Sequence, residues 1–417
     1  MTRHTPKMIL IPYKIVVHPA SPAAAWIVIG QVHAGAVRYA LRPTPEQESL
    51  LLEFCAHARF VWNLAVEQQT WWKPTRTAKV VPYSRQLAEA RAECGWLRAG
   101  SSVVQQQALR DFGQAMKNFL GGTHRRPAYR KKGLDEGFRI VNFKPGHARR
   151  LNRKNGQVFV PKIGWVRFRW SGPVGDARSF RVKRDPAGRW WVSFAVVPGP
   201  VNGPGTGEVV GIDRGVAVSA ALSNGEMYST PKPDGKAGRL QKKLSRQKKG
   251  SARRKDTRLE LARAHAREAN RRKDWAEKLS TDIARRYDVI RVEALAVKNM
   301  LRSAKGTVEA PGRNVAAKAG LNREISRSGW GILVARLEQK APGRVEKIPP
   351  AYTSQTCSQC GTTDKNSRKS QALFACVSCG YSGNADVNAA KNIAAGHAAR
   401  GAGKPPAPKR EPQLCAA

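Results

Sequence analysis

The chain has 417 residues, of which 74 are Lys or Arg and 30 are Asp or Glu, so its formal net charge is +44 at neutral pH. A protein this basic repels itself unless a polyanion neutralises it, and each neutralised nucleic-acid phosphate also releases a counterion. Because the excess runs along the whole chain, nucleic acid is favoured over an anionic membrane surface as the partner. The hydrophobic fraction of 41% is ordinary and allows a core.

Neither a membrane span nor a secretory leader is indicated. The most apolar stretch, Met8 to Ile29, is interrupted by Pro12, Lys14 and Pro22, so it lacks the roughly 20 apolar residues that cross a bilayer. Its apolar pieces are also too short for a good signal peptide. Seven cysteines in so long a chain do not form a disulfide scaffold. We therefore expect a cytoplasmic protein in which residues 1–36 form an N-terminal arm.

Organised structure is expected to begin with a strand at 37–41, followed by a helix. Thr44 and Gln47 have the spacing of a capping box, in which each side chain bonds the other's backbone N–H, and Pro45 suits the first helical position. Apolar residues continue at helical spacing through Trp62. Two further helices are predicted near 84–94 and 101–120.

From about residue 138 the apolar residues take the period of strands. The predicted strands are 157–160, 165–170, 179–183 and 190–197. The tetrapeptide Asp185-Pro186-Ala187-Gly188 is typical of a turn, so the last two strands should form a hairpin. In the second strand Val166 and Phe168 alternate with Arg167 and Arg169. One face would pack and the other would present guanidinium groups, either to phosphates or simply to solvent.

In the second half, short apolar strands end in carboxylates. The strands are 209–212 before Asp213, 217–222, 288–292 before Glu293, and 345–348. Helices are predicted at 321–339 and 386–395, and the second contains Asp386. Residues 236–273, which precede both helices in the chain, hold 16 Lys or Arg and three acidic residues, and we interpret this basic, partly helical segment as a surface that tracks a nucleic-acid strand.

The cysteines give the most specific signal. Cys357 and Cys360 form one Cys-x-x-Cys pair, and Cys376 and Cys379 form another after fifteen residues. Four thiolates complete a tetrahedron and leave no open position, which predicts one structural zinc ion; an iron–sulfur cluster or two disulfides are the alternatives. The other three cysteines have no partners at such spacing.

Three carboxylates are candidates for a second metal site. Asp213, Glu293 and Asp386 are hard oxygen ligands without a nearby histidine in the sequence, a set that suits Mg²⁺ or Mn²⁺ and not zinc. Two such ions can activate a water and stabilise the leaving oxygen of a phosphodiester. Taken singly, each of these residues could equally be an ordinary surface acid.

These blocks together resemble the TnpB-like RNA-guided nucleases and the compact type V CRISPR-associated effectors. The matching segments are Leu41–Gln47, Arg59–Asn63, Gly211-Ile212-Asp213-Arg214-Gly215, Val292-Glu293-Ala294-Leu295, the four-cysteine element and Asn384–Ile393. Two positions depart from the family pattern: Arg214 replaces the usual aliphatic residue, and Ala294 stands where an aspartate is common. A cation beside the site could weaken metal binding or alter the cleavage rate.

The resemblance implies a multidomain α+β fold. A β-barrel wedge domain (37–46 and 138–205) would be interrupted by a helical recognition domain (47–137). A RuvC-like nuclease domain of the RNase H fold (206–351 and 385–400) would follow, with a zinc-binding module (352–384) inserted and a disordered tail (401–417) after it. Asp213, Glu293 and Asp386 carry over as ligands of catalytic Mg²⁺ or Mn²⁺. Arg368 matches a family arginine that we place near the scissile phosphate, although it could be a surface residue of the zinc module.

The implied activity is an RNA-guided DNA endonuclease whose partners are a guide RNA and target double-stranded DNA. The protein would act as a monomer, or as a homodimer on one guide RNA, and would read a short motif beside the target. Two rival functions are open: an RNA-guided DNA binder with weak or no cleavage, and a protein-only transposase or resolvase. Aromatic residues that could stack on bases are Tyr39, Trp62, Trp71 and Trp72, although core packing is favoured for Trp62.

Overall fold

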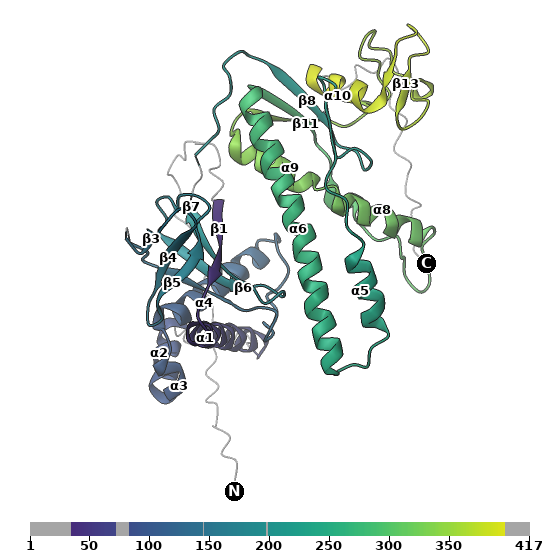
Figure 1. Ribbon diagram of the computed structural model, residues 1–417. Coiled ribbons are helices and arrows are strands. Elements are labelled where there is room, and N and C mark those ends of the chain that lie inside the picture. Colours follow the sequence, from purple (N-terminus) through teal and green to yellow (C-terminus); the bar gives the residue numbers. More distant parts are fainter. Residues whose placement is uncertain (1–34, 72–82, 145, 197–198, 397–417) are drawn as a thin grey trace, which may run out of the picture. The chain divides into compact units, whose positions relative to one another are not determined.

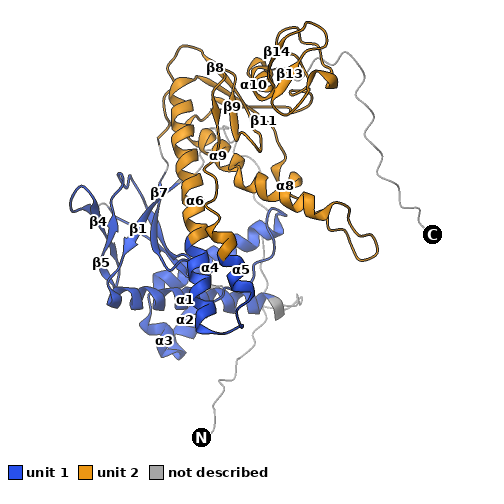
Figure 2. Ribbon diagram, turned by 45° about the vertical axis from the view of Figure 1, so that its right-hand side comes forward, with its two compact units in different colours: residues 1–198, 240–263 blue, residues 199–239, 264–417 orange. Residues whose placement is uncertain are grey.

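The computed structural model describes residues 35–71, 83–144, 146–196 and 199–396 (Figure 1). They form two compact units (Figure 2): unit 1 contains the chain up to residue 198 and residues 240–263, and unit 2 contains 199–239 and the chain from 264 onward. The predicted arm up to residue 34 and the predicted tail at 401–417 lie outside the described residues. No described helix is long and apolar enough to span a membrane.

Unit 1 is built on a seven-stranded antiparallel sheet with the order β2-β6-β7-β1-β5-β4-β3. The strands are β1 (Gly35–Arg42), β2 (Gly137–Val141), β3 (Ala148–Arg150), β4 (Asn155–Val160), β5 (Gly164–Arg169), β6 (Ser179–Arg184) and β7 (Trp190–Val196). Among the described residues the two edge strands, β2 and β3, do not pair, so the sheet is open and the expected closed barrel is not seen. Gly35 and Ala36, expected in the arm, already pair with β7.

The predicted alternation in β5 is confirmed. Val166 and Phe168 are completely buried, whereas Arg167 and Arg169 are exposed. The predicted hairpin is also present, because β6 pairs with β7 and the amide of Gly188 donates to the carbonyl of Asp185 at 2.9 Å. One face of the sheet therefore belongs to the core, and the other carries arginines.

Four helices accompany the sheet: α1 (Pro45–Trp71), α2 (Tyr83–Glu93), α3 (Gly95–Ala99) and α4 (Ser102–Leu120). The capping box is confirmed, since the Thr44 amide donates to Gln47 Oε1 at 3.2 Å and the Gln47 amide donates to Thr44 Oγ1 at 3.3 Å. The helices and the sheet share one hydrophobic core, in which the rings of Phe54 and Phe138 lie 5.4 Å apart.

Burial in this core tests whether the aromatic residues predicted to stack on bases are free to do so. Tyr39 is only 1% exposed and its hydroxyl donates to the carbonyl of Pro173, so the hypothesis that it stacks on a base is wrong. Trp62 is a core residue, as favoured, and its indole N–H donates to the carbonyl of Ala128. The side chain of Trp71 and the whole of Trp72 lie outside the described residues.

Unit 2 contains a five-stranded sheet with the order β10-β9-β8-β11-β12. The strands are β8 (Val209–Asp213), β9 (Ala220–Leu222), β10 (Met227–Tyr228), β11 (Val289–Glu293) and β12 (Val345–Ile348). The three strands β8, β11 and β12 run parallel. A second sheet of two strands, β13 (Leu373–Ala375) and β14 (Ser382–Asn384), belongs to the four-cysteine segment, as does the short 3₁₀ helix η1 (Lys365–Ser367).

The remaining helices are α5 (Lys236–Ser245), α6 (Ala252–Arg286), α7 (Val297–Met300), α8 (Val315–Arg327), α9 (Trp330–Lys340) and α10 (Ala385–Ala395). The single helix predicted at 321–339 is wrong, because α8 ends at Arg327 and α9 begins at Trp330. Gly329, between them, has a φ of 74°, a left-handed conformation that interrupts a helix and that glycine adopts at little cost.

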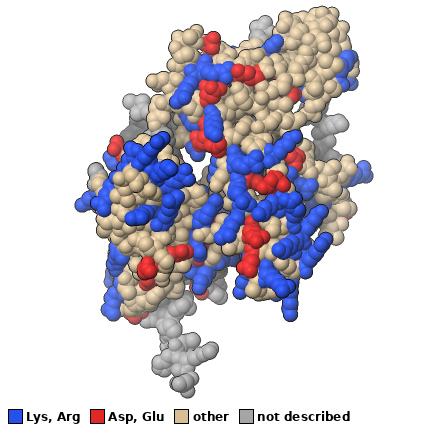
Figure 3. Space-filling model, in the orientation of Figure 1, with Lys and Arg blue, Asp and Glu red and all other residues tan. Residues whose placement is uncertain are grey.

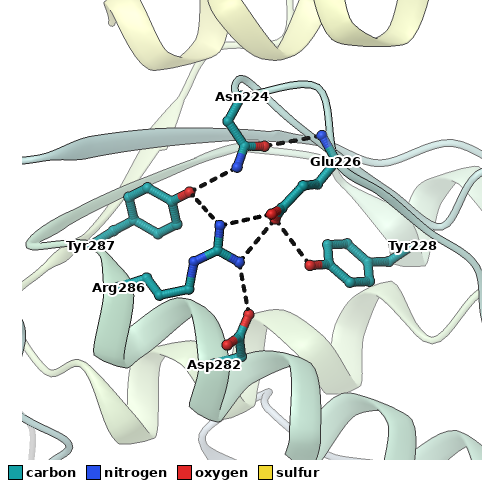
Figure 4. A network of polar contacts seen from close by, with 6 residues as sticks. All are labelled: Asn224, Glu226, Tyr228, Asp282, Arg286 and Tyr287. Carbon is teal, nitrogen blue, oxygen red and sulfur yellow. Dashed lines mark hydrogen bonds and ion pairs between the residues drawn. The ribbon is translucent and has the colours of Figure 1, made fainter.

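A polar network fastens the end of α6 to the β9–β10 turn (Figure 4). The Arg286 guanidinium donates to both carboxylate oxygens of Glu226 at 2.9 Å and to Asp282 at 3.0 Å. The hydroxyl of Tyr228 also donates to Glu226. These donors, above all Arg286, lower the pKa of Glu226 from 4.5 to about 2. The ion pair is 35–38% exposed, so water screens much of its strength.

We predict that Glu226→Gln costs about 0.5–1 kcal/mol of folding free energy at pH 7. Because the folded-state pKa is depressed, the ionised carboxylate stabilises the fold above about pH 4.5 and this contribution is lost as the pH falls toward 2. Urea unfolding at pH 7 and pH 3 measures the effect, because pH 3 lies well inside the range in which the contribution is lost. The variant should lose less stability than the wild type on acidification, and an equal loss would contradict the assignment.

Candidate metal centre and carboxylate site

The four predicted zinc ligands meet at one point in unit 2. The sulfur atoms of Cys357, Cys360, Cys376 and Cys379 all lie within 4.8 Å of one another. Cys357 Sγ is 3.7 Å from Cys379 Sγ, and Cys360 Sγ is 3.6 Å from Cys376 Sγ. A regular tetrahedron of sulfurs about 2.3 Å from a zinc ion has S···S edges of about 3.8 Å. The separations are far too long for disulfide bonds, so that alternative is wrong.

The backbone around each cysteine pair forms a tight turn. The amides of Gly361 and Gly380 donate to the carbonyls of Cys357 and Cys376, and both glycines have a φ of 74°. Further amides point at sulfur, including that of Ser378, which donates to Cys376 Sγ at 3.4 Å. Such N–H···S contacts stabilise thiolate charge. The donor set and its geometry therefore fit a structural zinc ion.

Asp213 and Glu293 lie at the ends of neighbouring parallel strands. In the ladder, Ile212 of β8 is paired with Val292 of β11, and the two acidic residues follow directly. Both strands end at the same edge of the sheet, so their carboxylates lie next to each other there. Glu293 is only 8% exposed, and the Thr353 hydroxyl donates to its Oε1 at 2.8 Å.

Helix α10 brings the third carboxylate. Asn384 caps this helix, since its side-chain oxygen accepts from the amides of Asp386 and Val387. The helix packs directly on β8 at Gly211, where a Cβ would overlap the Ala390 carbonyl oxygen and the Ala394 amide. Glycine at this position therefore permits the close approach that places Asp386, which is 6% exposed, in the site.

The three carboxylates influence one another electrostatically. Burial above all, together with the charges of Glu293 and Asp386, raises the pKa of Asp213 to about 7, although Arg368 acts in the opposite direction. Burial also raises the pKa of Glu293 and of Asp386. Buried acids that repel one another form a site whose negative charge a divalent cation would relieve.

The three acids do not form as compact a group of ligand atoms as the four cysteines. In the part of the chain that the structure describes, only the four cysteines have ligand atoms that are all within 4.8 Å of one another. The oxygens of Asp213, Glu293 and Asp386 therefore span a wider region.

Arg368 reaches the same site from the four-cysteine segment. Its guanidinium donates to Asp386 Oδ1 at 3.3 Å, and its side chain is 27% exposed. The structure thus brings together all four residues that the sequence marked, Asp213, Glu293, Asp386 and Arg368. Their catalytic roles stay predictions.

Arg214, one of the two departures from the family pattern, is buried beside the acids. It is 7% exposed, and one of its terminal nitrogens donates to the backbone carbonyl of Glu293. Its Nε has no hydrogen-bond partner, and no carboxylate of the described residues lies within 4.0 Å. The other departure, Ala294, is exposed, and its amide donates to the carbonyl of Ile348.

Sequence reasoning missed the residues that tie the cysteine segment to α10. Asn388 donates to the carbonyl of Thr356 at 2.8 Å, and Asn392 donates to the carbonyls of Thr353 and Thr356. The two asparagines are four residues apart and share one face of α10. Two buried amides at that spacing in an alanine-rich helix are the signal that could have revealed the contact.

Three protein families match parts of the chain. Residues 193–304 match the family described as "Probable transposase", associated with IS605 OrfB. Residues 330–393 match the "Cas12f1-like, TNB domain", and residues 35–76 match a helix-turn-helix domain of IS605 OrfB.

Two relatives are named "Putative RNA-guided DNA endonuclease". InsQ of Escherichia coli (strain K12) is 37% identical over 88% of this chain and 94% of its own. The chain belongs to the TnpB/IS605 transposase family. The second such relative, from Streptomyces pristinaespiralis, is 33% identical over 90% of this chain and 92% of its own. The family predicted from the sequence motifs is thus confirmed.

The compact type V effectors are similar over a shorter stretch of sequence and in fold. The "CRISPR-associated endodeoxyribonuclease Cas12f1" of Sulfoacidibacillus thermotolerans is 55% identical over 56 residues, 13% of each chain. The "Cryo-EM structure of the Cas12f1-sgRNA-target DNA complex" matches with a TM-score of 0.50 at 14% identity, covering 84% of this chain and 83% of that one. This second likeness concerns the fold alone.

We predict that Cys360→Ser lowers the zinc content of the purified chain from one ion to well below one. A closed tetrahedral site loses its stability when one thiolate is replaced, because the metal and the local fold depend on each other. Elemental analysis and limited proteolysis of the four-cysteine segment measure both effects. Cys94→Ser, which alters a cysteine outside the cluster, is the matched control. Full zinc content in Cys360→Ser would contradict this site.

We predict that Gly211→Ala destabilises unit 2 by about 1–3 kcal/mol, because the new methyl group overlaps the backbone of α10. The control is Gly331→Ala in α9, where a Cβ meets nothing within 4 Å and helix propensity favours alanine by roughly 0.5–1 kcal/mol. Chemical denaturation compares the two variants. A Gly211→Ala variant as stable as the wild type would show that α10 does not pack this closely.

Proposed function

We propose that this chain is an RNA-guided DNA endonuclease that hydrolyses phosphodiesters at the site of Asp213, Glu293 and Asp386. The convergence of these three acids at one sheet edge, in a chain with a net charge of +44, carries the proposal. The names of the full-length relatives support the activity and its RNA guide.

The residues present fit a pair of Mg²⁺ or Mn²⁺ ions, and we assign the three carboxylates as their ligands. Such ions, when bound, activate a water and stabilise the leaving oxygen of the cleaved strand. The chain's own part is to hold the ligands. The Thr353 hydroxyl orients Glu293, and the Asn384 cap fixes the helix turn that carries Asp386. Arg368, partly exposed beside Asp386, is positioned to donate to a phosphate.

We also propose the finer division of the chain. The sheet of unit 1 corresponds to the wedge domain (37–46 and 138–205), with the helical recognition domain at 47–137. The parallel strands and α10 of unit 2 correspond to the RuvC-like nuclease domain (206–351 and 385–400). The four-cysteine segment corresponds to the inserted zinc module (352–384). The two parallel strands that each end in a ligand support this assignment, together with the helix that delivers the third.

The burial of Arg214 favours one alternative, an RNA-guided DNA binder that cuts weakly. A fixed guanidinium near Glu293 opposes the binding of divalent cations by charge repulsion. Target binding and cleavage are therefore measured separately, with purified protein that retains its RNA. Ribonuclease treatment should abolish cleavage, and undiminished cleavage would instead support a protein-only transposase or resolvase.

We predict that Asp213→Asn abolishes cleavage of a matched target and leaves target binding in EDTA unchanged. It should also raise the melting temperature in EDTA at pH 8 by about 2–4 °C. The raised pKa of Asp213 means that stability is lost as the pH rises from about 4 to about 7, and the neutral amide removes this loss.

The matched control is Asp274→Asn, which changes an exposed acid of α6 that pairs with Lys278. It should change neither cleavage nor the melting temperature in EDTA by more than a degree or so. Retained cleavage in Asp213→Asn would remove this residue from the mechanism. A lowered melting temperature would show that its charge stabilises the fold.

A further inference from the structure

A hollow of ≈ 690 Å³ lies in unit 1, where the start of α1 meets β4 and β5. Its lining includes the cations Arg42 and Arg167, the aromatic Trp165, and four amide side chains, those of Gln47, Asn152, Asn155 and Gln157. Neither the carboxylates nor the cysteines take part in it. Lys and Arg side chains also gather over this sheet on the face shown in Figure 3.

Two arginines of the hollow face each other across neighbouring strands. Arg42 of β1 is the register partner of Arg167 of β5, and both are exposed. Like charges directly opposite in an antiparallel pair are destabilising. Among the described residues, no carboxylate lies within 4.0 Å of either guanidinium. The pair therefore lacks the counter-charge that would make the arrangement favourable.

Some arginines of this sheet and its turns pair with acids, whereas others, such as Arg169 of β5, have no carboxylate of the described residues within 4.0 Å. Arg181 and Arg139 pair with Asp111, Arg184 pairs with Glu48, and Arg189 pairs with Asp185. Arg42 and Arg167 differ from the other unpaired arginines in being register partners that both line one hollow. A bound anion would replace the missing acid.

The other residues that line the hollow have side chains suited to binding a nucleotide. Trp165 is partly buried against Phe159, with the Arg149 guanidinium 4.1 Å above its ring, so the indole is held in a fixed orientation beside the hollow. A held aromatic ring offers a stacking surface for a base. Amide side chains both donate and accept hydrogen bonds, which suits base edges and a ribose 2′-hydroxyl. The volume lies within the usual range for small-ligand sites, about 300–1,000 Å³.

We propose that this hollow binds one unpaired nucleotide of the guide RNA. Its phosphate lies between Arg42 and Arg167, and its base lies against Trp165. This assignment rests on the proposed function, because it takes the bound strand to be the guide. It adds a fixed anchoring point for RNA that is separate from the carboxylate site.

The test uses the full chain and the RNA that copurifies with it, sequenced, resynthesised and labelled. Binding is measured over a range of salt concentrations for the wild type, Arg167→Gln and Arg42→Gln/Arg167→Gln. Loss of one phosphate contact on a single strand lowers the slope of log K against log salt by about 0.7. Because both arginines hold one phosphate, the double variant should lose about 0.7, whereas a diffuse field would give about 1.4.

The matched control is Arg169→Gln. Arg169 lies on the same exposed face of β5 but does not line the hollow. The slope of log K against log salt for the Arg169→Gln variant should therefore equal that of the wild type. Ultraviolet crosslinking should also attach a ribonucleotide to the peptide that contains Trp165. A loss in Arg169→Gln equal to that in Arg167→Gln would overturn the proposal, as would a crosslink to DNA at this peptide. Wild-type protein that binds no RNA would overturn the proposed function as well, whereas RNA binding with unchanged variants overturns this pocket alone.

Discussion

The site depends on the close contact between α10 and β8 at Gly211. A helix can approach a strand this closely only where the strand has no side chain on the facing side, because even a methyl group would overlap the backbone of Ala390 and Ala394. The contact places the first turn of α10, with Asp386, beside the end of β8, with Asp213. At the other end of the helix, Arg291 of β11 donates to the carbonyl of Ala394 at 2.6 Å, where a cation is favoured by the helix dipole. Both strands that end in acids therefore hold the helix that brings the third.

The four-cysteine segment also helps to hold the carboxylates in place. It lies between Glu293 and Asp386 in sequence, and its residues contact both: the Thr353 hydroxyl bonds Glu293, and Arg368 bonds Asp386. The amides of Asn388 and Asn392 then fasten the segment to α10. A zinc ion that orders the cysteine turns thereby also fixes groups that touch two of the three acids. A zinc ion held by four thiolates would be structural in its coordination, yet its binding energy would support the geometry of the carboxylates.

Local patterns predicted the parts of this arrangement that depend on neighbouring residues. Short stretches of sequence determine the capping box at Thr44, the alternation in β5, and the strand ends at Asp213 and Glu293. The interruption at Gly329 was missed because apolar spacing continued across it. The burial of Tyr39, the open edges of the larger sheet, and the hydrogen bonds of Asn388 arise from contacts between distant segments. Family resemblance supplied the grouping of the three acids, which periodicity alone could not.

The charge of Arg214 sets the electrostatic balance of the site. A buried guanidinium without an ion pair costs several kcal/mol unless nearby charges compensate for it. Here Glu293 and Asp213 are the acids that favour its charged form, although neither is within ion-pair distance. Arg214 thus neutralises part of the same negative charge that attracts divalent cations. Its hydrogen bond to the Glu293 carbonyl also joins the ends of β8 and β11, which fixes the spacing of two proposed ligands. Geometry and charge therefore act in opposite directions: the bond preorganises the ligands, and the cation weakens their attraction for metal.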